Sequence, residues 1–272
     1  MNDAPVPAET RPVGGDSLFA HVLVGIDATP ESLVGAAQAA TLRAPDGRIT
    51  LVAVVERHLA AHAGLAAADA EDRLLADTRT DLARARELVD ADDALLASGR
   101  LVDLLFTECV RRDATLVAVG VRAHRRLAAL TFGGHDVDAL HDAPCSLLLA
   151  RPGWGPSRPE KIVVGVDATP EARTAEAAAR SLARRLGCAI APVVGLADDV
   201  DLALLRAERE DALLDPGRLV DAVARASSSS SLVVVGSTAE RGRRWGGSRA
   251  EQVAYGARCS VLVVRHSAEA PA

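Results

Sequence analysis

"VLVGIDATPES" spans Val22–Ser32, and the chain repeats it as "IVVGVDATPEA" over Ile162–Ala172. Each copy starts with an apolar run that has no polar alternation, which is typical of a strand buried on both faces. A threonine able to cap a helix follows, and then a proline suited to the first helical position, at Thr29–Pro30 and Thr169–Pro170. The repeated segment therefore predicts a strand that turns directly into a helix, in two related domains.

The repeat continues along the chain, and its changing offset locates a deletion. The opening segments are 140 residues apart, whereas "GRLVD" recurs 118 residues apart, at Gly99 and Gly217. "CSLLLAR" at Cys145 returns as "CSVLVVR" at Cys259, 114 residues on. The fall from 140 to 118 means that about 22 residues are missing before Gly217. In the first copy that interval contains Asp69–Asp90, which has helical spacing of its apolar residues, so the second copy should lack most of this helix.

Short apolar runs alternate with helical patterns in the first copy, which favours a parallel sheet covered by helices. The expected strands are Val22–Ile26, Ile49–Val55, Ala94–Ala97, Leu116–Val119 and Ser146–Ala150. The expected helices are about Pro30–Ala44, Asp69–Asp90, Arg100–Arg112 and Asp136–Asp142. The Pro- and Gly-rich "RPGWGPSRPE" is typical of a linker. We therefore expect a disordered tail (1–18), domain 1 (19–151), a linker (152–159), a shortened domain 2 (160–266) and a second tail (267–272).

Composition restricts the class of protein. The net charge of -6 argues against nucleic-acid binding, which requires a basic surface. No segment has the apolar length of a membrane span, and the polar N-terminal segment does not resemble a signal peptide. None of the four cysteines forms a Cys-x-x-Cys pair, so they are expected to be buried or incidental thiols of a cytoplasmic protein.

The repeated corner also carries candidate binding residues. Asp27 and Asp167 follow the first strand of each copy, at the carboxyl edge where open parallel sheets bind ligands. A carboxylate would repel a phosphate and suits a hydrogen-bond donor instead, such as an adenine amino group or a ribose hydroxyl. The alternative is that each aspartate only compensates the positive end of the following helix. The spacing leaves both interpretations open.

Both copies resemble universal stress protein domains. The resemblance rests on "VLVGIDATPES", "GRLVDLLFTECVRRDATLVAVG" and "APCSLLLAR" in the first copy, and on "IVVGVDATPEA", "GRLVDAVARASSSSSLVVVG" and "ARCSVLVVR" in the second. It implies an α/β fold with two Rossmann-like (HUP-type) domains, each a five-stranded parallel sheet flanked by helices. It also implies that the domains pair like a dimer of single-domain relatives, often through the last strands, Cys145–Ala150 and Cys259–Val264.

Family members that bind ATP carry Gly-x2-Gly-x9-Gly-(Ser/Thr) after the fourth strand, where bare backbone approaches the ribose and phosphates. The first copy keeps the spacing but has alanine at the second glycine and glycine at the hydroxyl position: Gly120, Ala123, Gly133 and Gly134. The second copy has a loop two residues shorter, with Gly236, Ala239, Gly247 and Ser248. Ser248 also fits a capping box with Glu251. Both motifs are therefore degenerate.

These loops are rich in basic residues, which favours an anionic partner but also fits a solvated loop. The basic residues are Arg122, His124, Arg125 and Arg126 in the first copy and Arg241, Arg243, Arg244 and Arg249 in the second. His58 and His62 have a spacing that could bind a metal on a helix, but no third ligand lies nearby. No catalytic motif is present, so an adenylating enzyme of the wider fold ranks behind the non-enzymatic alternatives.

The leading hypothesis is a non-enzymatic stress-response regulator with at most one working ATP site, with or without Mg²⁺. The resemblance places that site in domain 1, at Asp27, Ala28, Val54, Val55, Gly120, Arg122, Ala123, Gly133 and Gly134. The corresponding residues of domain 2 are Asp167, Gly236, Gly247 and Ser248. The alternative is a nucleotide-free scaffold for protein partners, because the deletion in domain 2 should expose apolar sheet surface. Intramolecular pairing of the domains is expected, and a homodimer is also allowed; no metal or catalytic residue is assigned.

Overall fold

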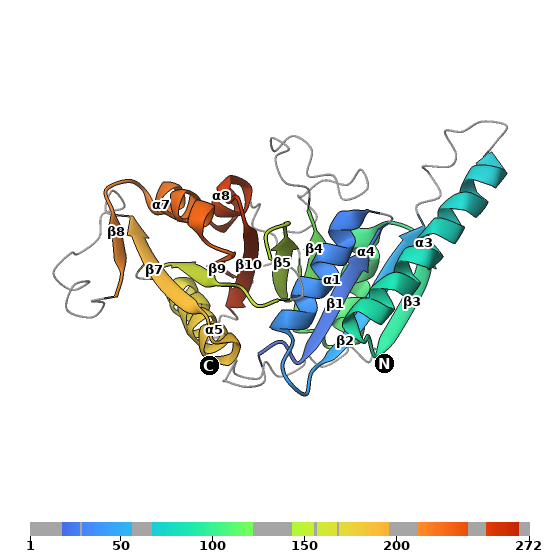
Figure 1. Ribbon diagram of the computed structural model, residues 1–272, viewed down its shortest axis with the longest axis horizontal. Helices are drawn as coiled ribbons and strands as arrows, with labels where there is room; N and C mark the ends of the chain where they lie inside the picture. Colours follow the sequence, from blue (N-terminus) through green and yellow to red (C-terminus); the bar gives the residue numbers. More distant parts are fainter. Residues whose placement is uncertain are drawn as a thin grey trace, which may run out of the picture.

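The computed structural model describes residues 18–27, 29–55, 67–121, 143–154, 157–167, 169–195, 211–238 and 249–266, with side chains of the long helix from residue 72 onward. Its strands form one ten-stranded sheet with the order β3-β2-β1-β4-β5-β10-β9-β6-β7-β8 (Figure 1). All neighbouring strands are parallel except β5 and β10, which are antiparallel. The molecule is therefore two parallel α/β domains joined edge to edge.

The first domain contains five strands and three described helices. The strands are β1 (His21–Ile26), β2 (Arg48–Val55), β3 (Asp93–Ser98), β4 (Leu116–Gly120) and β5 (Ser146–Ala150), and the helices are α1 (Pro30–Leu42), α3 (Ala67–Val89) and α4 (Leu101–Arg111). The five expected strands and three of the four expected helices of this domain are confirmed, with ends shifted by a few residues at most. The helix expected at Asp136–Asp142 lies outside the described residues.

The second domain repeats this arrangement in a shorter form. Its strands are β6 (Lys161–Gly165), β7 (Ala189–Gly195), β8 (Leu213–Asp215), β9 (Leu232–Thr238) and β10 (Ser260–His266), and its helices are α5 (Pro170–Leu186), α7 (Leu219–Ala226), the 3-10 turn η5 (Ser227–Ser229) and α8 (Arg249–Gly256). Only residues 196–212 separate β7 from β8, too few for a counterpart of the 23-residue α3 with its connections. The length of this connection thus agrees with the expected loss of most of this helix.

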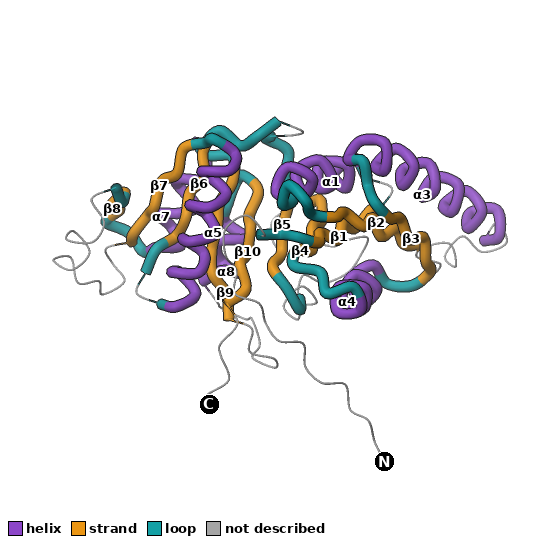
Figure 2. The backbone as a smooth tube through the Cα atoms, turned by 90° about the horizontal axis from the view of Figure 1, so that it is seen from below, coloured by secondary structure: helices purple, strands orange, loops and turns teal. Residues whose placement is uncertain are grey.

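Helices cover both faces of the sheet, and alternate side chains of each strand reach opposite faces. Figure 2 shows α1 and α3 on one side of the first-domain strands and α4 on the other. On β5, Leu148 packs into the core beneath α1 and α5, whereas Leu147 and Leu149 pack into the core beneath α4, α7 and α8. Each core continues from one domain into the other, because β5 and β10 join the two sheets.

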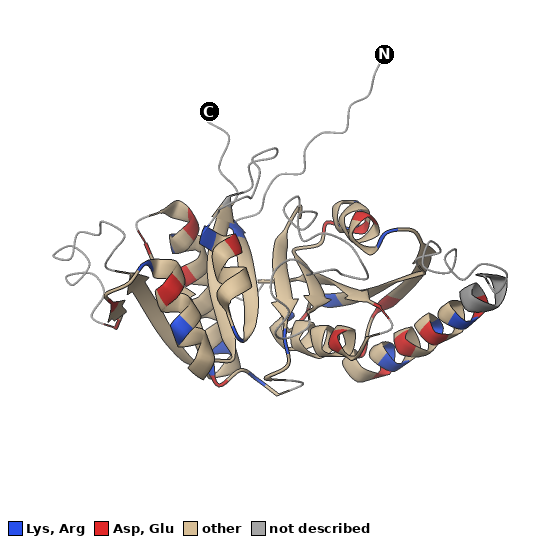
Figure 3. Cartoon of the chain, turned by 90° about the horizontal axis from the view of Figure 1, so that it is seen from above, with Lys and Arg blue, Asp and Glu red and all other residues tan. Residues whose placement is uncertain are grey.

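Charged residues gather along α3 in Figure 3, on a helix whose described side chains are mostly exposed. This polarity agrees with a helix that presents one narrow apolar side to the sheet, where Ala85 and Val89 are buried. In the part of the chain that the structure describes, no helix is both long enough and apolar enough to cross a membrane.

The two domains meet through the last strand of each, as the resemblance implied. Leu147, Leu148 and Leu149 of β5 lie opposite Val263, Leu262 and Val261 of β10. Two reciprocal hydrogen bonds flank these pairs. The backbone N–H of Arg151 donates to Ser260 Oγ at 2.9 Å, and that of Arg265 donates to Ser146 Oγ at 3.2 Å. The repeated Cys-Ser…Arg segment thus makes the contact nearly two-fold symmetric.

Buried polar groups strengthen this junction. The Arg151 guanidinium donates to the carbonyl of Ala254 at 2.7 Å, in the last turn of α8, and to that of Cys259 at 3.0 Å. Gln38 of α1 donates to the carbonyls of Arg151 and Trp154, both at 2.7 Å, and accepts from Ser260 Oγ at 2.7 Å. Because buried polar groups require partners, these contacts define one relative placement of the domains.

Candidate functional site

The first candidate site begins where α1 packs onto the end of β4. A Cβ on Gly120 would lie 1.9 Å from the carbonyl oxygen of Glu31 in the first turn of α1. A Cβ on Gly35, one turn later, would lie 2.9 Å from the backbone nitrogen of Gly120. Helix and strand therefore touch backbone to backbone. Gly120 therefore has to be a glycine because of this helix–strand packing, whether or not a ligand binds nearby.

Asp27 lies at the same edge, directly after β1, and its side chain is largely buried. Its carboxylate accepts a hydrogen bond from Thr29 Oγ1, and its backbone carbonyl accepts one from Ser32 Oγ at 2.8 Å. Burial raises the pKa of Asp27, and the hydrogen bonds from Thr29 and Ser32 oppose that effect. No Lys or Arg among the described residues forms an ion pair with Asp27. The corner thus contains a buried acceptor whose protein partners are hydroxyl groups.

The two expected helix caps differ. Thr169 behaves as expected, since its hydroxyl accepts from the backbone N–H of Ala172 at 3.2 Å. Thr29 has the extended backbone of an N-cap, but its side chain makes no capping hydrogen bond. The expectation for Thr29 is therefore wrong in this respect. Both threonine hydroxyls donate to the aspartate two residues earlier, so the corners differ only in that Thr29 Oγ1 accepts no hydrogen bond from the first turn of its helix.

The second corner is arranged differently, because a cation occupies its aspartate. Arg249 Nη1, at the start of α8, lies 2.6 Å from Asp167 Oδ2. Thr169 donates to the other oxygen of the carboxylate from its backbone N–H at 2.9 Å and from its hydroxyl at 2.5 Å. Both oxygens of Asp167 therefore already have partners. Two alternatives were open for the basic residues: a loop that is merely solvated, or ligands for an anion. Arg249 agrees with neither, because its guanidinium is paired with Asp167.

A small hollow, partly open to solvent, adjoins this ion pair. It is lined by the ends of β6 and β9 and by α5, α7 and α8, at Gly165, Asp167, Thr169, Ala172, Leu219, Val223, Val235, Gly236, Arg249, Ala250 and Val253. A Cβ on Gly236 would lie 2.1 Å from the carbonyl oxygen of Glu171, so this glycine repeats the packing role of Gly120.

The expected base-lining residues lie at the end of β2. Val54 and Val55 are buried, and Val54 packs into the core beneath α4. In the register of the sheet the counterpart of Val54 is Gly195, because Val52 pairs with Gly25 in the first domain and Val193 pairs with Gly165 in the second. A Cβ on Gly195 would lie 2.0 Å from the backbone nitrogen of Leu219, the first residue of α7. In the second domain, the start of α7 therefore lies where the first domain carries the Val54 side chain.

Several expected site residues lie outside the described part of the chain. They are Ala28, Arg122, Ala123, Gly133, Gly134, Gly247 and Ser248, together with Ala239, His58, His62 and the other basic loop residues, all except Arg249. The structure brings Asp27 and Gly120 to the two sides of the first turn of α1, and Asp167 and Gly236 to the corresponding sides of α5. Among described residues, no group of three His, Cys, Asp or Glu side chains could hold a metal ion.

Sequence reasoning missed the hydroxyl partner of Asp27 and the cationic partner of Asp167. The repeated Asp-Ala-Thr segment was a usable signal for the first, since an Asp and a Thr two residues apart commonly form a local side-chain turn. Arg249 was noticed only for its charge. Its partner is 82 residues away in the sequence, and no local pattern indicates that pairing.

Comparison with known proteins agrees with this architecture. Residues 19–151 match the universal stress protein family. A universal stress protein from Archaeoglobus fulgidus DSM 4304 is 15% identical, with a TM-score of 0.64 over 91% of this chain and 98% of its own. A functionally unknown protein from Pseudomonas aeruginosa PAO1 is 18% identical, with a TM-score of 0.63 over 92% of this chain and 93% of its own. No curated protein sequence matches the chain.

The chain thus contains a universal stress protein domain at residues 19–151, followed by a second domain of the same fold in tandem. A universal stress protein solved in complex with cAMP is 19% identical and covers 38% of this chain and 77% of its own, with a TM-score of 0.31.

Proposed function

We propose that this protein is a non-enzymatic stress-response regulator that binds one adenine nucleotide, ATP with or without Mg²⁺, in its first domain. Asp27 would accept a hydrogen bond from the adenine or ribose, Val54 and Val55 would line the base, and Gly120 would border the phosphate-side loop. The observation that carries this proposal is the difference between the two corners. Asp167 is paired with Arg249, whereas Asp27 has only hydroxyl and backbone partners among the described residues.

The residues of the first corner fit a neutral donor better than a phosphate. A buried carboxylate repels an anion but accepts a hydrogen bond from an amino or hydroxyl group. Asp27 also lies at the carboxyl edge of a parallel sheet, the usual binding edge of this architecture. ATP, when bound, would supply those donors through its base and sugar, and its phosphates would require the loop that follows β4.

The second domain is less suited to the same ligand. A nucleotide there would have to displace Arg249 from Asp167, and it would meet the first turn of α7 at Gly195. Two features of the shortened domain thus oppose binding at the place where the first domain favours it. We therefore expect a stoichiometry of one nucleotide per chain.

Calorimetric titration of the full chain with Mg²⁺-ATP tests this proposal. Asp27→Ala should weaken binding roughly 10- to 100-fold, the effect of a lost hydrogen bond to a charged group. Asp167→Ala is the matched control at the equivalent repeat position, and its affinity should stay within about twofold of the parent. Absence of both heat and thermal stabilisation at millimolar ATP would remove the proposal, and loss of binding in Asp167→Ala alone would move the site to domain 2.

A nucleotide-free scaffold for protein partners is the second candidate. The edge strand β8 favours it, because Leu213 and Leu214 of this short strand remain 50% and 38% exposed. Exposed leucines on a sheet edge are suited to contact another chain. If the parent protein binds no nucleotide in the titration above, and Leu213→Asp abolishes an interaction with a partner, the scaffold function is the one that holds.

A further inference from the structure

Two cysteines of the first domain lie close together in the core. Sγ of Cys109, near the end of α4, is 3.0 Å from Sγ of Cys145, immediately before β5. Both are free thiols. A disulfide requires about 2.05 Å between sulfurs, so the pair needs to close by only about 1 Å. Their separation of 36 residues in sequence means that the fold, and not the local chain, brings them together.

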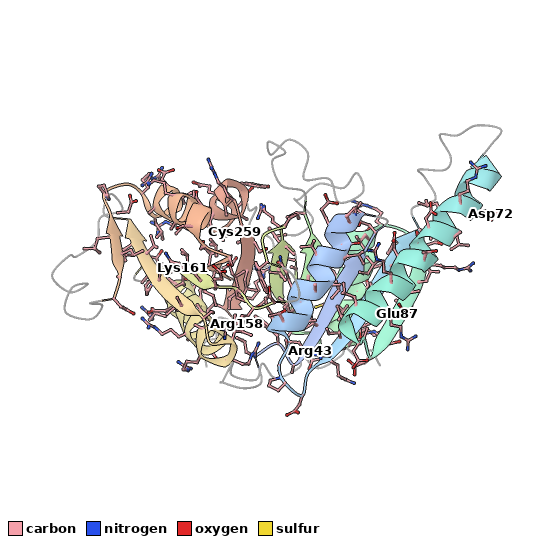
Figure 4. The ribbon with its side chains drawn as sticks, in the orientation of Figure 1. Arg43, Asp72, Glu87, Arg158, Lys161 and Cys259 are labelled. Carbon is pink, nitrogen blue, oxygen red and sulfur yellow. The ribbon has the colours of Figure 1, made fainter. Side chains whose placement is uncertain are left out.

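The internal repeat contains a natural comparison for this pair. Cys259 of the second domain occupies the position of Cys145 in the repeat. The position of Cys109 is occupied by Ser227, which lies 118 residues later, the same offset as that between the two "GRLVD" segments. Ser227 is as buried as Cys109, at 2% exposure for each. Its hydroxyl donates to the carbonyl of Ala224 at 2.6 Å and accepts from the N–H of Arg258 at 2.9 Å. The second domain therefore has one thiol where the first has two (Cys259 is labelled in Figure 4).

The surroundings of the two thiols assign them different roles. Cys109 is fully buried, whereas Cys145 is only partly buried and lies at the domain junction. The guanidinium of Arg265, from β10, donates at 2.6 Å to the carbonyl of Ala143, two residues before Cys145. Its charge favours the thiolate at Cys145, although the hydrogen bond with the Cys109 thiol and burial raise the pKa of Cys145 overall. Cys145 is thus the more exposed residue of the two and is assigned the first reaction with an oxidant, and Cys109 is positioned to react second.

We propose that Cys109 and Cys145 form a reversible disulfide when the protein meets hydrogen peroxide, and that the second domain has no equivalent modification. Cys145 sulfur attacks one peroxide oxygen, and the O–O bond breaks to leave a sulfenic acid and one water. Cys109 sulfur then attacks Cys145 sulfur, and the S–O bond breaks to release the second water. The two thiols together lose two electrons and two protons, which reduce one peroxide to two waters.

The bond would join the end of α4 to the start of β5. It would therefore fix both ends of the segment from 110 to 144, which contains β4 and the loop expected to contact a nucleotide. Closing a loop of this length restricts the conformations of the unfolded chain. A dithiol reductant would restore the two thiols by exchange.

Thiol counting in denaturant and peptide mass mapping test the proposal on the full chain. After peroxide treatment, two of the four thiols should be lost, the chain mass should fall by two hydrogens, and one linked peptide pair should contain Cys109 and Cys145. Dithiothreitol should restore all four thiols. Four titratable thiols after a treatment that oxidises a control dithiol, a link involving Cys188 or Cys259, or an unlinked sulfinic acid at Cys145 would each overturn the proposal.

Two variants give the matched comparison. Cys109→Ser copies the second domain, and it should form no disulfide and leave a sulfenic acid at Cys145 that dimedone traps. Cys259→Ser, at the equivalent of Cys145, should still form the Cys109–Cys145 bond in full. If Cys109→Ser does not fold, Cys259→Ser and the wild-type map still decide the outcome, because loss of the bond in Cys259→Ser contradicts the assigned pairing.

Discussion

Arg249 Nη1 lies 2.6 Å from Asp167 Oδ2, whereas the equivalent Asp27 has no Lys or Arg partner among the described residues of the first domain. The arginine side chain is half exposed and the aspartate is mostly buried. The ion pair joins the first corner of the domain to the helix that precedes its last strand. Two copies of one sequence motif have therefore acquired different electrostatic surroundings.

This ion pair should contribute little to stability. A double-mutant cycle with Asp167→Asn and Arg249→Gln should give a coupling energy of no more than about 1 kcal/mol, because a partly exposed pair is screened by solvent. Urea denaturation at 0.1 M and 1 M salt measures the coupling and its screening. A coupling of several kcal/mol that salt does not reduce would contradict this expectation.

Gly120 should be intolerant of any side chain. Gly120→Ala places a methyl group 1.9 Å from the carbonyl oxygen of Glu31, where only backbone can move, and should cost at least about 2 kcal/mol in free energy of unfolding. Gly256→Ala is the control, since its Cβ would meet nothing closer than Ala224 Cβ at 3.4 Å. That change should stay within about 1 kcal/mol of the parent. Equal urea midpoints for the two variants would refute the packing role of Gly120.

His21 should make stability fall at mildly acidic pH. Its side chain is buried, with Nδ1 3.1 Å from the carbonyl oxygen of Arg112 and Nε2 2.9 Å from Thr50 Oγ1. Burial lowers the pKa of His21 and the charges of Arg48 and Arg112 reinforce this, whereas the hydrogen bond to the Arg112 carbonyl and the charge of Asp92 oppose it. The unfolded chain therefore takes up the proton first as the pH falls below about 6.5, and the folded state loses stability there.

The His21 effect is measured as the difference between the wild type and His21→Gln in urea midpoints at pH 7.5 and pH 5.5. The variant should be less stable at the higher pH but lose less on acidification. Asp27 acts in the opposite direction at lower pH, because its raised pKa means that the folded state binds a proton before the unfolded state does. Identical pH dependence in both proteins would exclude His21 as the titrating group.

Gln38 should be important for joining the domains. Gln38→Ala leaves the carbonyls of Arg151 and Trp154 without these donors and removes the acceptor for Ser260 Oγ. Because all of these groups are buried, we expect a loss of about 2–4 kcal/mol. Thr107→Ala is a suitable control, since it removes only an exposed hydrogen bond within α4. A Gln38 variant no less stable than this control would show that the network is not needed.

Much of the fold could be predicted because its signals are local. The apolar runs at β1 and β6, the Thr-Pro helix starts and the falling repeat offset depend only on residues close in sequence or on comparison of the two copies. The pairing of β5 with β10 followed from the family resemblance and not from periodicity, since an apolar run does not show which strand it pairs with. Its antiparallel direction came only from the structure.

The candidate sites could be predicted only in part, for the same physical reason. The sequence by itself placed Asp27 and Asp167 after their strands and Gly120 and Gly236 at the ends of theirs. Only the tertiary structure decided that Arg249 pairs with one aspartate, that α1 and α5 press backbone against the two glycines, and that Gln38 contacts Ser260, 222 residues away. Secondary structure reflects the preferences of neighbouring residues, whereas these partners meet only when the completed sheet brings distant segments together.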